Sequence, residues 1–163
     1  MVAQHIAFGV TAAAIGLSAL RVVTTKNIVH AALYLTVVLA GVAALYILLA
    51  AEFVFAVQVI VYIGAIVVLF LFGIMLTRSP MGNSDELDNN QRPVAAVVAL
   101  FLAGALGALL IDAFRDNKIA DPTIARTGDI GADIFQKFVI PFEVVSVLLL
   151  AALVGAVVIA RRD

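Results

Sequence analysis

The chain has 163 residues and a net charge of −1, with 64% hydrophobic and 13% charged residues. A water-soluble domain of this size could not bury so large an apolar fraction, so the composition predicts an integral membrane protein. The near-zero charge argues against a nucleic-acid partner, and the lack of cysteine excludes disulfides, iron–sulfur clusters and a cysteine nucleophile within the chain.

Five apolar runs follow one another along the sequence, and each predicts a transmembrane helix. As helices they would measure about 27–36 Å, close to the hydrocarbon thickness of about 30 Å. None alternates apolar and polar residues as a barrel strand would. We therefore expect one all-α, multi-pass membrane domain over residues 1–163, with spans at about 2–20, 28–51, 53–76, 94–111 and 139–160.

The first run resembles a signal peptide in length but not in charge. A signal peptide carries its positive charge before the apolar stretch. Here no charged residue precedes the run and Arg21 follows it. The sequence thus predicts a retained first span with the N-terminus outside.

Residues 28–76 contain a single charged residue, Glu52. One helix of that length would exceed two hydrocarbon thicknesses, so the chain must reverse. We expect a tight hairpin near Ala50–Glu52. Glu52 at its tip is either a solvated turn residue, the simpler interpretation, or a protonatable group.

The distribution of basic residues predicts the orientation. One side of the membrane receives most of them: Arg21, Lys26, Arg78, Arg92, Arg161 and Arg162. The basic residues of the other side are spread through the longest loop, residues 112–138. The positive-inside rule then places the C-terminus in the cytoplasm. The polar stretch at residues 79–91 is predicted to be a flexible cytoplasmic linker.

No Lys, Arg, Asp, Glu or His lies at the middle of any predicted span, which argues against a proton carrier acting alone. His5 and His30 are expected at opposite faces of the membrane, so they cannot ligate one haem. Glu143, just after Pro141, either complements the dipole of the fifth helix or is a partly buried acid that faces another subunit and pairs with Ser146.

The third span has the most unusual composition, because Tyr62 lies near the bilayer centre and its hydroxyl needs a partner. Gln58, four residues earlier, is one candidate. On an α-helix these two residues would share a face with Phe55, Ala65 and Leu69. The simplest interpretation is a tyrosine that only packs. In the fourth span, small residues form a common helix-packing pattern: Ala103, Gly104, Gly107 and Ala108.

The third span, Glu52–Met75, resembles subunit J of the proton-pumping NADH–quinone oxidoreductase, respiratory complex I. Its Tyr62-x-Gly64-Ala65 core with a Val/Leu/Phe tail is the specific part. The start of the second span, Asn27–Leu35, and the fifth span, Glu143–Gly155, are similar to the same family. The length and the five spans also fit.

The resemblance implies a membrane-arm subunit that couples quinone reduction to proton translocation, without an active site or cofactor of its own. NADH, FMN, iron–sulfur clusters and quinone would bind in other subunits of the enzyme. The implied partners are the quinone-site subunit, the small carboxylate-bearing subunit, the antiporter-like subunits and lipid. The implied location is the bacterial cell membrane.

The resemblance also implies a switchable π-bulge in the third span, whose appearance and loss accompany changes of state. Tyr62, Gly64, Ala65 and Phe70 inherit this role in our sequence. Gln58 is neutral, so no proton-binding role passes to it.

Two alternatives remain open from the sequence. One is a membrane subunit of a multisubunit cation/proton antiporter, and the other is a multi-span interaction protein with no bioenergetic role. Co-purifying NADH dehydrogenase activity would favour complex I, whereas stable purification without partners would favour the interaction protein.

Overall fold

The computed structural model describes residues 2–77, 91–115 and 126–161. All secondary structure in this part of the chain is helical. The elements are α1 (Val2–Thr24), α2 (Ile28–Leu48), α3 (Glu52–Val57), η1 (Gln58–Val67), α4 (Val68–Leu76), α5 (Arg92–Phe114), α6 (Thr127–Gln136) and α7 (Val139–Ala160). The predicted linker at residues 79–91 lies outside the described residues except for Gln91, as do Arg78, Lys118 and Arg162.

Five helical segments in the described residues are long and apolar enough to cross a membrane, which confirms the predicted five-span architecture. The third span is built from α3, η1 and α4 without interruption. The first and fourth spans extend beyond their apolar cores, and the second ends earlier than expected, at Leu48. Polar residues continue a helix past the hydrocarbon as long as its backbone bonds persist, which composition does not predict.

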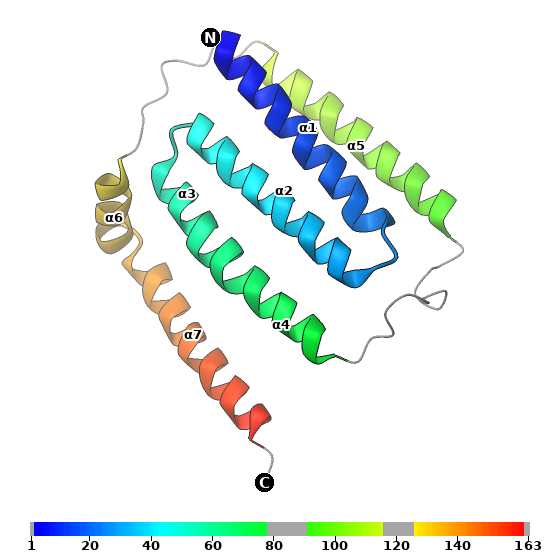
Figure 1. Ribbon diagram of the computed structural model, residues 1–163. Coiled ribbons are helices and arrows are strands. Elements are labelled where there is room, and N and C mark those ends of the chain that lie inside the picture. Colours follow the sequence, from blue (N-terminus) through cyan, green and yellow to red (C-terminus); the bar gives the residue numbers. More distant parts are fainter. Residues whose placement is uncertain (1, 78–90, 116–125, 162–163) are drawn as a thin grey trace.

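Helix α2 lies between α1 and the third span, in an antiparallel layer (Figure 1). Small residues allow the close approach. A methyl group added at Gly41 of α2 would overlap the side chain of Ile15 in α1. The buried apolar residues of the described chain are Ala32, Ala43 and Val67, as expected where membrane helices pack through small side chains.

The hairpin between α2 and α3 closes with a Schellman-type turn. Ala50 adopts a left-handed conformation with φ 55°. Its N–H donates to the Ile47 carbonyl at 2.9 Å, and the Ala51 N–H donates to the Tyr46 carbonyl at 2.9 Å. These bonds satisfy carbonyls at the end of α2. The chain therefore reverses near Ala50–Glu52, as the sequence predicts.

The sequence predicts one loop over residues 112–138, whereas the structure has a helix there, α6. The Asp129 carboxylate accepts the Arg126 N–H at 3.3 Å, and this contact starts the helix. Asp133 and Lys137 form an ion pair of 2.8 Å at its end. The rings of Phe135 and Phe142, with centroids 5.0 Å apart, connect α6 to α7 edge to face.

Helix α5 makes no close backbone approach to another described element, and α7 approaches only α6. The side chains of both helices are almost entirely exposed. Ideal Cβ atoms built at Gly104 and Gly107 would meet nothing within 4 Å. The small-residue pattern of the fourth span therefore faces no part of the described chain.

Candidate functional site

The centre of the third span is a π-helix of 10 residues, Gln58–Val67. In a π-helix each N–H bonds the carbonyl five residues earlier, so each turn holds about one residue more than in an α-helix. The two end residues are both buried, with exposed fractions of 6% for Gln58 and 4% for Val67. On an α-helix they would point about 180° apart.

Outside the third span, α2 is the element that η1 approaches within the described structure. Gln58 and Val67 are therefore buried against the same neighbour, and the π geometry makes this possible. The π conformation that the resemblance implied near the Tyr-x-Gly core is present, and it covers more than a single bulged turn.

The predicted face of Phe55, Gln58, Tyr62, Ala65 and Leu69 is wrong. Tyr62 is 46% exposed and Leu69 is 72% exposed, although Gln58 is buried. The prediction assumed α-helical spacing. Because each π turn holds more residues, the side of the span that faces α2 contains Gln58, Ile63 and Val67. Tyr62 is turned away from α2.

The predicted pairing of Gln58 with Tyr62 is also wrong. The Gln58 Nε2 donates to the backbone carbonyl of Leu39, in the middle of α2, at 3.3 Å. The Tyr62 hydroxyl takes part in no hydrogen bond with the described residues. Its half-exposed position leaves it available to water or to a neighbouring subunit.

Gly64 lies near the centre of the π-helix, where the addition of a side chain is tight. A Cβ at this position would lie 3.3 Å from the carbonyl oxygen of Val59, closer than an ordinary van der Waals contact. Val59 stands five residues earlier and is the π-helical acceptor for Gly64. The neighbouring Ala65 lies in η1, whereas Phe70 lies beyond it in α4 and is 45% exposed.

The two candidate carboxylates lie away from the π-helix. Glu52 is exposed in the first turn of α3, where it complements the helix dipole. Glu143 is exposed on α7 and falls after the first turn, which weakens the dipole interpretation because that effect fades within one turn. The predicted pairing with Ser146 is wrong, since Ser146 Oγ donates to the Phe142 carbonyl at 2.9 Å.

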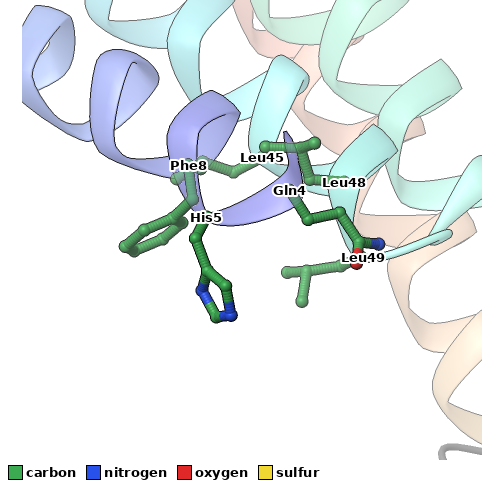
Figure 2. Close-up of a pocket in the computed structure, with 6 residues that line it drawn as sticks. All are labelled: Gln4, His5, Phe8, Leu45, Leu48 and Leu49. Atoms are coloured by element: carbon green, nitrogen blue, oxygen red, sulfur yellow. The ribbon is translucent and has the colours of Figure 1, made fainter. Parts of the chain in front are cut away.

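The two histidines lie at opposite ends of the α1–α2 pair, as predicted. His30 is in the first turn of α2, which is capped by Asn27 through its Oδ1 and the Val29 N–H at 2.9 Å. His5 borders a hollow of about 210 Å³ between the start of α1 and the end of α2 (Figure 2). The hollow is mostly apolar, and its lining residues are Gln4, His5, Phe8, Leu45, Leu48 and Leu49. The described residues contain no group of three or more His, Asp or Glu that could hold a metal ion.

Comparison with known proteins identifies the family. The family model of NADH-ubiquinone/plastoquinone oxidoreductase chain 6 matches residues 18–159. The chain belongs to this family. It is therefore a membrane subunit of a complex I-type quinone oxidoreductase, and the antiporter alternative is not favoured.

Similar proteins come from archaea and cyanobacteria. F(420)H(2) dehydrogenase subunit J of Methanosarcina mazei is 42% identical over 163 residues, covering 96% of this chain and 90% of that protein. NAD(P)H-quinone oxidoreductase chain 6 of Synechocystis is 40% identical, covering 98% and 82%. The same subunit of Leptolyngbya boryana is 38% identical, covering 98% and 81%.

Sequence reasoning missed Leu39, Ile63 and Val67 as parts of the site. Leu39 contributes a backbone oxygen, for which no side chain could give a signal. Ile63 and Val67 are apolar residues in an apolar run, and only the helix type decides that they face α2.

Proposed function

We propose that this chain is a non-catalytic coupling subunit of its quinone oxidoreductase, and that its third span changes helix register during turnover. The observation that carries the proposal is the π-helix of η1 in a span without a charged residue between Phe53 and Thr77. Such a span cannot carry protons on its own groups. It can change the shape of a water path that neighbouring subunits complete.

The relatives are named for different electron donors, which supports a role for this subunit that does not include binding the donor. One relative is named for F(420)H(2) and others for NAD(P)H, yet each matches this chain over most of its length at about the same identity. A subunit that recognised the donor would differ between them. We therefore assign the NADH, FMN, iron–sulfur and quinone sites to other subunits.

The register change has a defined geometry. Converting one π turn to α removes one residue from the turn and rotates everything downstream by about 100°. The side facing α2 would pass from Ile63 and Val67 to Tyr62 and Ile66, and Phe70 of α4 would turn inward. Gly64 and Ala65 allow the change because their small side chains fit either register.

The free-energy gap between the two registers must be small. A ligand shifts a two-state equilibrium only by its differential affinity for the states, so the gap is at most a few kcal/mol. The backbone hydrogen bonds of a π-helix have poorer geometry than those of an α-helix, which raises the free energy of the π register. The burial of Gln58 and Val67 against α2 offsets this cost. Binding events at the quinone site can then shift the balance.

The unpacked helices indicate where partners bind. The small-residue face of α5 meets no other described element, and α7 meets only α6, because apolar membrane helices do not need one another when lipid is available. We assign these surfaces to the quinone-site subunit, the small carboxylate-bearing subunit and the antiporter-like subunits, with lipid covering the remainder. The exposed Glu143 on α7 would then face a neighbouring subunit.

We place the subunit in the bacterial cell membrane with its N-terminus outside and its C-terminus in the cytoplasm. The support is the positive-inside distribution of basic residues, together with the five candidate membrane spans, of which α1, α2 and the third span lie antiparallel in one layer (Figure 1).

The test is purification of a tagged chain in mild detergent, followed by identification of the proteins that accompany it. We expect flavin- and iron–sulfur-bearing subunits, and donor:quinone activity that drives proton uptake when the assembly is reconstituted in vesicles. Recovery of the folded chain alone, or with antiporter subunits that lack donor oxidation, would contradict the proposal.

A further inference from the structure

Gln58 is the buried polar residue of the described chain, with 6% of its surface exposed. It stands at the boundary where α3 ends and the π-helix begins. Its side chain does not bond within its own span but crosses to α2. A buried amide at this depth must find its hydrogen-bond partner within the protein, because the hydrocarbon offers no water.

The acceptor of this bond is a carbonyl inside a regular helix. In α2 the Leu39 carbonyl accepts the N–H of Ala43, one turn later, and it keeps a second lone pair. Gln58 Nε2 uses that lone pair at 3.3 Å, so the contact adds to α2 without breaking it. Ala43 is itself buried, and its single methyl group leaves room beside the carbonyl.

We infer that Gln58 is a positioning residue that fixes the upstream end of the register change to α2; this inference rests on the proposed function. When the number of residues per turn changes, one end of the span must rotate relative to the other. The upstream end is held twice, by the hairpin turn at Ala50 and by the bond to Leu39. The rotation is therefore delivered to α4 and to Phe70.

The mechanism predicts what happens without the bond. If the upstream half can also turn, a register change is divided between α3 and α4, and less of it reaches the downstream surface. The amide of one membrane hydrogen bond contributes a factor of about three to such an equilibrium. Proton translocation per quinone reduced should fall, while electron transfer to a soluble artificial acceptor should not change.

The experiment compares Gln58→Met, Gln58→Asn and Gln58→Glu in the whole complex, reconstituted in vesicles at pH 6. Met keeps the length but lacks a donor, and Asn keeps the donor but is one methylene too short. A carboxyl held in an apolar setting keeps its proton at this pH and can donate through its O–H, so Glu restores the contact. Gln136→Met, on the exposed surface of α6, is the matched control.

We expect Gln58→Met and Gln58→Asn to lower the proton-to-quinone ratio, and Gln58→Glu and the Gln136→Met control to leave it at the wild-type value. A map of the Met complex should show a displaced start of the π-helix. A wild-type ratio in Gln58→Met overturns the inference, as does an equal loss in Gln58→Glu, which would mean that shape rather than donation matters.

A parallel Gly64→Val variant separates this inference from the proposed function. If Gly64→Val uncouples the enzyme and Gln58→Met does not, the register change stands and the role of Gln58 is wrong. If neither variant uncouples an enzyme that contains this chain, both ideas are wrong.

Discussion

Gln58 and Val67, the first and last residues of a 10-residue π-helix, are buried against the same neighbouring helix. An α-helix would place them on opposite sides, about 180° apart. The π geometry therefore decides which surface of the third span meets α2. Tyr62, Ile66 and Phe70 are half exposed. Tyr62 and Ile66 each precede by one residue a side chain that faces α2, Ile63 or Val67.

Gly64→Val should uncouple the enzyme. A Cβ at this position lies 3.3 Å from the Val59 carbonyl oxygen, and a branched side chain would add stiff bulk at the turn that the register change must reshape. Gly73→Val is the matched control, because a Cβ there meets nothing within 4 Å. We expect proton translocation per quinone to fall in the first variant only, with both complexes assembled. Equal ratios in the two variants would contradict the steric argument.

Gly41→Val should weaken the packing of α1 on α2. The added Cβ would overlap the side chain of Ile15, and overpacking of this kind costs about 1–3 kcal/mol. Thermal denaturation of the purified complex measures the loss. Gly16→Val in α1, where nothing lies within 4 Å, serves as the control, and Ile15→Ala combined with Gly41→Ala should recover most of the stability. If the double variant does not recover the stability, the loss in Gly41→Val does not come from a clash with Ile15.

Ala50→Gly should stabilise the hairpin between α2 and α3. Ala50 has φ 55°, a conformation that costs a residue with a Cβ about 1–2 kcal/mol and glycine little. Ala51, with φ −91°, is the control, since glycine there only adds freedom to the unfolded chain. We expect a higher melting temperature for the first variant and an unchanged or lower one for the second. The reverse order would show that the left-handed turn does not persist in the membrane.

Reporter fusions test the orientation. A cytoplasmic reporter should be active after Asp163 and inactive after Arg126, because most basic residues lie on the side of the C-terminus. An external reporter should give the opposite pattern. Activity of the cytoplasmic reporter after Arg126 would invert the proposed topology.

Hydropathy alone predicted the five spans and the reversal at Ala50–Glu52, since both follow from the length of an apolar helix that fits the membrane. The π-helix was expected only through the family resemblance, because the same Val, Ile and Gly residues fit an α-helix in isolation. The side of the π-helix that faces α2 depends on the bond from Gln58 to the backbone carbonyl of Leu39, and no pattern of side chains reveals a backbone acceptor in another helix.

Helix α6 escaped prediction for a different reason. It is 10 residues long, contains two glycines, and depends on Phe135 packing against Phe142 rather than on its own propensity. The pairing of Glu143 with Ser146 failed because a serine in a helix readily bonds the carbonyl four residues earlier, as Ser146 does with Phe142.

The decisive measurement for the proposed register change is the structure of the third span in two functional states. Cryo-electron microscopy of the complex at rest and during quinone turnover would show which residues face α2. We expect a register change that places Ile63 and Val67 against α2 in one state, and Tyr62, Ile66 and Phe70 in the other, with Gln58 bonded to Leu39 in both. An unchanged π-helix from Gln58 to Val67 in both states of an actively pumping enzyme would contradict it.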